Sequence, residues 1–241
     1  MKLAAALVAA LVLGALPFVT SSNYIVGVGI SALIFTVAAV ALNLVYGFAG
    51  LLSFAQLGFW GIGGYAAALT VMTFGGSFWQ GVLWAALLNG AIALLVGYPM
   101  LRTNRHAFVI STLTFALLVT LVARDWVSLT RGPLGIPNLP SPHAFGLRFD
   151  TPARFYWLVW AFAVTTIAFL YALCSSRIGR TLVAIKQNEP LTRAQGISPM
   201  PYKLAAFALS AAITGAAGGV YCFISASSTR RSSISIICRP S

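Results

Sequence analysis

The sequence predicts an all-α fold, a polytopic bundle of transmembrane helices with about seven spans, one of them a glycine-rich, broken helix. Of its 241 residues, 59% are hydrophobic and only 7% are charged, whereas a soluble domain carries roughly 25% charged residues. A helix crosses the ~30 Å hydrocarbon core in about 20 residues. The length therefore accommodates about six to eight spans and very little soluble domain.

Seven apolar runs are long enough, or nearly so, to cross a bilayer. They are residues 3–20, 24–46, 51–74, 78–100, 107–123, 155–173 and 204–225. The first run follows Lys2 and also has features of a signal peptide, but it is long and no Ala-x-Ala cleavage site follows it. We therefore expect it to be retained as a span.

The distribution of basic residues predicts the orientation of these spans. The net charge of +12 comes from 15 Lys and Arg against three acids. These residues lie in short segments between apolar runs, not on one polar face, so we expect no nucleic-acid partner. Since Lys and Arg accumulate in cytoplasmic loops, segments 101–106 and 175–203 are expected in the cytoplasm. The Gly- and Pro-rich connection at 124–154 is expected outside.

Residues 41–65 combine glycines with polar side chains in a way that lipid-facing helices do not. Asn43, Ser53 and Gln56 would be costly against lipid, so we expect them to line a translocation path or to form bridging hydrogen bonds between helices. Small residues let helix backbones approach closely. Close helix packing is predicted at Gly47, Gly50, Gly58, Gly61, Gly63, Gly64, Gly215 and Gly219.

The sequence shows no motif for catalysis, metal binding or cofactor binding. It lacks a phosphate loop, an H-E-x-x-H motif and an Asp/Glu pair within a span. No metal site is predicted from the isolated histidines and widely spaced cysteines, which are His106, His143, Cys174, Cys222 and Cys238. We expect a non-enzymatic transporter whose energy comes from another subunit.

One segment outside the spans has helical amphipathicity. Within residues 176–189, Ile178, Leu182 and Ile185 share one helical side, with charged residues around them. This pattern predicts a helix that lies at the membrane surface or docks on a protein. Pro190 interrupts the pattern, and Gly196 is suited to terminate the continuation.

Four segments together carry a family resemblance. They are the run from Leu42-Asn43-Leu44 to Gly61-Ile-Gly-Gly-Tyr65, Phe108-Val-Ile-Ser-Thr-Leu-Thr-Phe115, Leu129-Thr-Arg-Gly-Pro-Leu-Gly-Ile136, and Ser176-Arg-Ile-Gly-Arg180 continuing to Tyr202-Lys-Leu204. In these segments the chain resembles the LivM-like permeases of ABC importers for branched-chain amino acids.

The resemblance implies the permease subunit of an ATP-driven importer for branched-chain amino acids or related small amino acids and amides. It implies a multi-pass protein of the bacterial inner membrane, in contact with membrane lipid and paired with a second permease as a heterodimer. It also implies two ATPase subunits that carry ATP and Mg, and a periplasmic substrate-binding protein, with no cofactor on this chain. A docking role on the ATPase is implied for Arg180, Lys186, Glu189, Ala194 and Gly196.

The resemblance covers about residues 24–224, and two features depart from it. Pro190 and Arg193 stand where such permeases have helix formers, so we expect the docking helix to break or end early. Residues 1–226 are expected to form an incomplete permease domain, with a cytoplasmic coupling loop at 176–203. We expect an atypical Ser/Arg tail without helical patterning at 227–241, as in a truncated or frameshifted product.

Two alternatives remain at this point. One is an ion-coupled secondary carrier, in which the glycine-rich segment itself binds solute and ion. The other is a non-functional truncated permease fragment.

Overall fold

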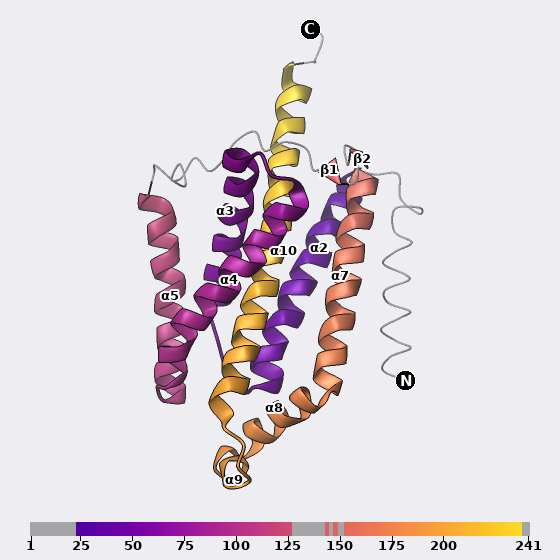
Figure 1. Cartoon of the computed structure of the whole chain (residues 1–241). Helices are drawn as coiled ribbons and strands as arrows, with labels where there is room; N and C mark the ends of the chain where they lie inside the picture. Colours follow the sequence, from indigo (N-terminus) through magenta and orange to yellow (C-terminus); the bar gives the residue numbers. More distant parts are fainter. Residues whose placement is uncertain (1–22, 127–142, 145–146, 149–151, 238–241) are drawn as a thin grey trace.

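Six helices in the described part of the chain are long and apolar enough to cross a membrane (Figure 1). The structure, a computed structural model, describes residues 23–126, 143–144, 147–148 and 152–237. The six spans are Tyr24–Phe48, Gln56–Phe74, Phe78–Leu101, Arg105–Asp125, Arg154–Ser175 and Pro199–Ile224. The predicted first span and most of the outer connection lie outside the described residues.

The assigned elements of the described residues are helical apart from one short strand pair. In order they are α2 (Asn23–Asn43), the π-helix η1 (Leu44–Phe48), α3 (Gln56–Phe74), α4 (Phe78–Leu101), α5 (Arg105–Asp125), β1 (His143–Ala144), β2 (Leu147–Arg148), α7 (Pro152–Ser175), α8 (Arg177–Gln187), α9 (Glu189–Ala194) and α10 (Pro199–Ile237). Strands β1 and β2 pair antiparallel. The all-α membrane bundle is therefore confirmed.

Helix α10 lies at the centre of the bundle. It packs against α4, α3 and α2, and 67% of its most apolar stretch is buried. Helix α5 lies at the periphery, where only 17% of the corresponding stretch is buried. Its exposed apolar side chains include Ile110, Leu113, Leu117 and Leu121. Because lipid tails are as apolar as Leu, such a surface is stable against lipid.

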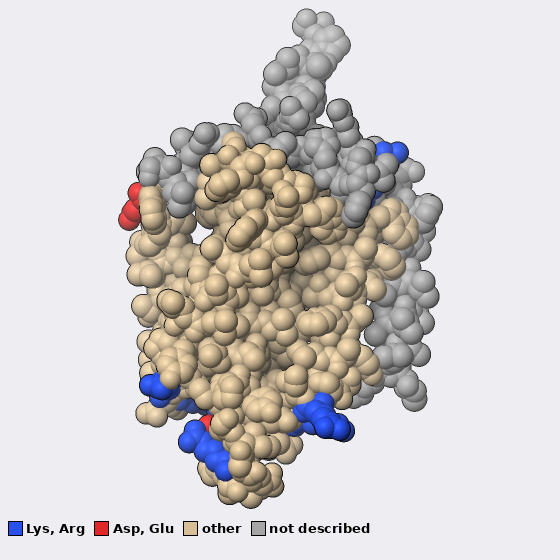
Figure 2. Space-filling view, in the orientation of Figure 1, with Lys and Arg blue, Asp and Glu red and all other residues tan. Residues whose placement is uncertain are grey.

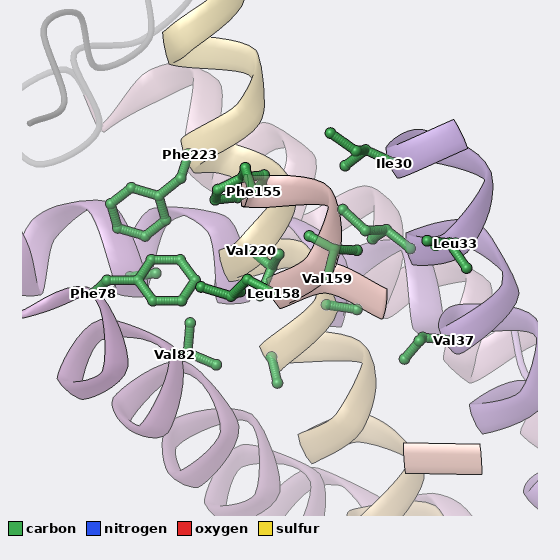
Figure 3. Close-up of a cluster of buried hydrophobic side chains, with 14 of the residues drawn as sticks. Ile30, Leu33, Val37, Phe78, Val82, Phe155, Leu158, Val159, Val220 and Phe223 are labelled. Atoms are coloured by element: carbon green, nitrogen blue, oxygen red, sulfur yellow. The ribbon is translucent and has the colours of Figure 1, made fainter. Parts of the chain in front are cut away.

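An apolar core joins five of these helices, α2, α3, α4, α7 and α10. Figure 3 shows side chains from α2, α4, α7 and α10 pointing toward one another. The Phe78 ring meets Phe223 edge-on with centroids 5.0 Å apart, and meets Phe155 at 6.3 Å. Such aromatic pairs add about 0.5–1.5 kcal/mol beyond their burial. A capping box between Ser77 and Gln80 begins α4 and fixes the helical turn that carries Phe78.

The last helix is longer than the predicted span at 204–225. Helix α10 begins at Pro199 and continues to Ile237, so the Ser-rich segment after Ile224 is helical where no helical pattern was expected. No Gly or Pro occurs between Val220 and Ile237. Ser and Thr lower helix stability by only about 0.5 kcal/mol each, which does not stop a helix that has already formed.

Basic side chains are concentrated at one end of the bundle. Figure 2 shows Lys and Arg gathered at the end that carries α8 and α9. We call this the basic end; its described charged residues are Arg102, Arg105, Arg177, Arg180, Lys186, Glu189, Arg193 and Lys203. The two sets of Lys and Arg predicted on one side of the membrane, at 101–106 and 175–203, thus lie at the same end of the molecule.

Candidate functional site: a broken helix and a docking segment

The chain between α2 and α3 departs from regular α-helix. Helix α2 passes into the π-helix η1, and residues 49–55 are not helical apart from a turn at Ala55. Gly50 has φ +71°, in the left-handed region that favours glycine. The break expected in the glycine-rich helix is present, and α3 begins at Gln56 instead of residue 51. Short π-helical segments are often found at functional sites.

The backbone of this break is held by hydrogen bonds outside regular helix. The N–H of Leu51 donates to the carbonyl oxygen of Val45 at 3.0 Å. The N–H of Phe54 donates to Thr112 Oγ1 at 3.3 Å, and the N–H of Ala55 donates to Ser53 Oγ at 3.3 Å. Ser53 is buried, and its hydroxyl accepts from the loop itself. The Ser53 side chain therefore stabilises the conformation of the loop by a local hydrogen bond.

Gln56 connects three helices through one hydrogen-bond network. Its Nε2 donates to Ser210 Oγ at 2.7 Å, and its Oε1 accepts from Thr214 Oγ1 at 2.6 Å. Ser210 donates in turn to the carbonyl oxygen of Ala41 at 2.6 Å. Ser210 and Thr214 are buried and lie one turn apart on α10. The network links α3, α10 and α2, and its α10 members were not predicted from the sequence.

Asn43, the third polar residue of the glycine-rich stretch, has a different position. Its side chain is exposed at the end of α2, and it lies over Gly47, where an added Cβ would overlap Asn43 Oδ1. Asn43 therefore faces away from the helix contacts of this chain, unlike Ser53 and Gln56.

Backbone-to-backbone contacts between α3 and α10 depend on glycine. A Cβ added at Gly63 would overlap the carbonyl oxygen of Gly215, and one added at Gly218 would overlap the carbonyl oxygen of Trp60. Gly218 was not among the glycines expected in close packing, although the run Gly215-Ala-Ala-Gly-Gly219 contains it. The signal for Gly218 was a second pair of small residues four positions apart, Thr214 and Gly218, which lies one position before the pair Gly215 and Gly219.

The other glycines expected in close packing have varied surroundings. An added Cβ would be close to a neighbour at two of them: 3.1 Å from the Phe115 ring at Gly58, and 3.0 Å from Ala67 Cβ at Gly219. At Gly64 an added Cβ would lie at an ordinary contact distance of 3.5 Å from the carbonyl oxygen of Gly218. Gly61 differs from the expectation, because a Cβ there would meet no atom within 4 Å. Gly61 lies on the side of α3 that the described helices leave uncovered.

Asn89 of α4 is a buried polar residue that was not predicted as a site residue from the sequence. It is fully buried, and its Nδ2 donates to the carbonyl oxygen of Ala85 at 2.8 Å. Its side chain occupies the space beside Gly215, where an added Cβ would overlap it. The amide thus fills the gap that this glycine leaves between α4 and α10.

Helices α8 and α9 form a bent segment on the basic end, which we call the docking segment after the role expected for it from the sequence. Gly179, Leu182 and Ile185 of α8 are buried, whereas Ile178, expected on the same side, is exposed. The expected break near Pro190 is present. Helix α8 ends at Gln187, and Asn188 is extended.

Both ends of α9 are capped by side-chain or backbone hydrogen bonds. The Asn188 side chain accepts from the N–H of Leu191 at 3.1 Å, which caps the helix start. At the other end Gly196 has φ +82°, and its N–H donates to Arg193 O at 3.0 Å while that of Ile197 donates to Thr192 O at 3.3 Å. This bonding pattern is a Schellman motif. Gly196 therefore ends the segment, as its sequence position suggested.

Two charged residues attach the docking segment to the membrane bundle. Lys186 Nζ donates to the carbonyl oxygen of Gly47 at 2.8 Å. Glu189 forms ion pairs with Lys203 at 2.6 Å and with Arg193 at 2.8 Å. Partial burial opposes ionisation of Glu189, but the hydrogen bonds and charges of Lys203 and Arg193 outweigh it and lower the pKa of its carboxyl group.

The remaining residues expected to dock on a partner are exposed. These are Arg180, Ala194 and Gly196. Leu191, which was not among the predicted docking residues, is exposed as well, with 57% of its surface accessible. The sequence signal for an exposed apolar contact residue was the single leucine within the polar stretch Glu189-Pro-Leu-Thr-Arg193.

The sequence of this chain is similar to one known protein family and to individual members of it. Residues 24–236 match the family described as "Branched-chain amino acid transport system / permease component", so the match extends beyond residue 224, where the resemblance was expected to end. The chain is 32% identical to the high-affinity branched-chain amino acid transport system permease protein LivM of Escherichia coli (strain K12), over 89% of this chain and 56% of that protein. It is 31% identical to LivM of Salmonella typhimurium (strain LT2), over 85% and 53%.

The chain thus spans about half the length of the curated relatives it matches. No solved structure matches it. Since the family match covers most of the chain and the described part holds six membrane-spanning helices, this multi-pass membrane protein belongs to the permease components of branched-chain amino acid transport systems.

Proposed function

We propose that this chain acts as the membrane-spanning permease subunit of an ATP-driven importer for branched-chain amino acids or related small amino acids and amides. The family match supports this function, as do the names of both relatives. The ion-coupled carrier does not fit the family. Within the importer, this chain binds no cofactor, and ATP with Mg binds to two separate ATPase subunits.

The proposed location is the bacterial inner membrane, with the basic end in the cytoplasm. The clustering of Lys and Arg at this end supports the orientation. A periplasmic binding protein then delivers substrate to the opposite end, near β1 and β2. A second permease subunit completes the path as a heterodimer.

The observation that carries the proposal is the construction of the docking segment. Lys186 and Glu189 attach it to the bundle, while Arg180, Leu191 and Gly196 remain exposed. A short capped helix with one exposed leucine and a nearby arginine suits insertion into a groove of a partner protein. At the cytoplasmic side, that partner is the ATPase.

Movement of the docking segment has a direct connection to the proposed path. Lys186 joins α8 to η1 at Gly47, and η1 leads through the break to Gln56. Asn43 is exposed on the same stretch and offers a neutral donor and acceptor to a solute at the interface with the second permease. Ser53 and Gln56 then hold the path wall in place.

Co-purification tests the proposal. The tagged chain is expressed with its ATPase and second permease and extracted in mild detergent. Arg180→Glu and Gly196→Pro are expected to abolish ATPase recovery, because one reverses a charge on the docking surface and the other removes the N–H that caps α9. Arg124→Glu, at the opposite end of the bundle, is the matched charge-reversal control and retains recovery. An ATPase recovered equally with all three variants would contradict the assignment.

A further inference from the structure

A cavity lies at the basic end between the docking segment and the α4–α5 turn. Its volume is about 970 Å³, enough for a phosphate group and its substituents. Its walls are residues 49–51 of the break, residues 101–105 and Phe108, residues 185–190 and Arg193 of the docking segment, and Met200 and Lys203 of α10. Four parts of the chain that are far apart in sequence thus enclose one space.

The lining of this cavity has a large excess of positive charge. Its basic residues are Arg102, Arg105, Lys186, Arg193 and Lys203, and its one acidic residue is Glu189. The Glu189 carboxylate is already shared by Arg193 and Lys203. The five positive charges of the lining repel one another, and the single negative charge of Glu189 offsets only part of this repulsion. An anion bound in the cavity would therefore be stabilised.

The two arginines of the α4–α5 turn are available to such an anion. The Arg102 guanidinium lies 4.4 Å from the centre of the Tyr98 ring and donates to its hydroxyl, a contact that leaves its charge uncompensated. Arg105 is exposed, and the ion pairs of the described residues involve neither arginine. A guanidinium presents five N–H donors in a planar fork that matches phosphate oxygens.

The start of α5 adds to the same wall. Asn104 is the N-cap residue of this 21-residue helix, and its side chain makes no capping hydrogen bond. The first N–H groups of a helix have no partner within the helix, and they lie at the positive end of its dipole. At this wall they reinforce the charges of Arg102 and Arg105.

We propose that this cavity binds a phosphate group. The group belongs either to an anionic phospholipid of the surrounding leaflet or to a soluble phosphate compound, and both present the same oxygens to the arginines. A bound phosphate connects the α4–α5 turn to α9 and α10, and so fixes the docking segment against the bundle. Its contacts are expected to be charge-assisted hydrogen bonds, chiefly from Arg102 and Arg105.

Direct binding to the purified full chain tests the site. The chain is kept in a neutral maltoside detergent at constant ionic strength, set with sodium chloride. It is titrated with sodium phosphate in one arm and with phosphatidylglycerol in the other, against a phosphate-free galactolipid with the same acyl chains. Calorimetry and the midpoint of thermal unfolding by tryptophan fluorescence report binding. Saturable binding of sodium phosphate indicates a soluble ligand, and binding of phosphatidylglycerol alone indicates a lipid headgroup.

Charge-matched variants separate a defined site from a diffuse surface potential. Arg102→Gln with Arg105→Gln is expected to weaken phosphate binding by about tenfold or more, given the strength of hydrogen bonds to charged groups. Arg177→Gln with Arg180→Gln removes the same charge at the same end but outside the cavity lining, and affinity is expected to change less than about twofold because screened surface charges contribute little.

Equal loss in both pairs, or no saturable binding of either phosphate probe to the wild-type chain, would overturn the proposal. Should the first pair fail to fold, Arg105→Gln alone gives the result, since this exposed side chain is replaced without loss of packing.

Discussion

The ammonium group of Lys186 in α8 donates a 2.8 Å hydrogen bond to the carbonyl oxygen of Gly47 in η1, across 139 positions of sequence. The alkyl part of the same side chain packs on Gly50, where an added Cβ would lie 2.7 Å from Lys186 Cγ. Lys186 therefore contacts the broken helix directly from the docking segment.

Replacing Lys186 by Met is expected to separate docking from transport. Methionine keeps most of the apolar stem and removes the donor, and because the hydrogen bond is exposed the chain is expected to fold with a loss of about 1 kcal/mol or less. ATPase recovery is expected to persist while ATP-driven uptake in the assembled importer falls. Lys186→Arg, which retains a donor, is the control. Unchanged uptake by Lys186→Met would show that this contact does not transmit the movement.

Gln56→Leu is expected to lower the free energy of unfolding by about 1–2 kcal/mol, in the range of hydrogen bonds between membrane helices. The change removes both hydrogen bonds to α10 and leaves Ser210 and Thr214 with fewer partners. The measurement is denaturant or thermal unfolding in detergent. Thr165→Val is the control, because Thr165 is exposed and bonds only to its own helix, at Ala161 O. Equal stability of the two variants would remove the bridging role from Gln56.

Most element positions follow from sequence, whereas the partners of individual residues do not. The run at 78–100 predicts α4 to within one residue, because apolar length and a Ser-Phe-x-Gln start are local signals. The break after η1 also has local signals, in Gly50 and the neighbouring polar groups. Pro190 likewise indicates the bend between α8 and α9.

Contacts between distant segments lie beyond such local signals. Gln56 bonds to residues more than 150 positions away, and no periodicity relates the two segments. Gly61 and Gly63 are neighbours in the same glycine-rich run, yet only the rotation of α3 decides which of them meets α10. The identity of the exposed residues on α9, including Leu191, depends in the same way on how the docking segment packs.

Gly63→Ala is expected to be far more damaging than Gly61→Ala. An alanine methyl group at Gly63 would overlap the Gly215 carbonyl, which is backbone and cannot rotate away. Overpacking of this kind costs about 1–3 kcal/mol. The same change at Gly61 meets open space and is expected to be neutral or slightly stabilising in the helix. Thermal unfolding of the two variants, made in parallel, checks the contact between α3 and α10; indistinguishable midpoints would contradict it.

Acidification is expected to weaken the attachment of α9 through Glu189. The pKa of this carboxyl group is lower in the folded chain than its usual value of about 4.3. Its ion pairs therefore stabilise the fold above that pH, and the contribution disappears as pH falls through the lowered folded-state pKa.

The difference in thermal midpoint between wild type and Glu189→Gln is the appropriate measurement. It is expected to be constant from about pH 6 to 8 and to shrink below about pH 4. A difference that stays the same at acidic pH would show that the glutamine variant acts through packing and not through the ion pairs with Lys203 and Arg193.

Photocrosslinking from the docking segment tests the central claim, that this chain is the permease subunit of an ATP-driven importer. A benzoylphenylalanine replaces Leu191, which is exposed on α9, and in a matched control replaces Leu95, which is exposed on the membrane-spanning part of α4. After irradiation of membranes that contain the partner subunits, the position 191 probe is expected to yield an adduct with the ATPase, and the position 95 probe none. No ATPase adduct from position 191, in a chain that is stably inserted, would contradict the account.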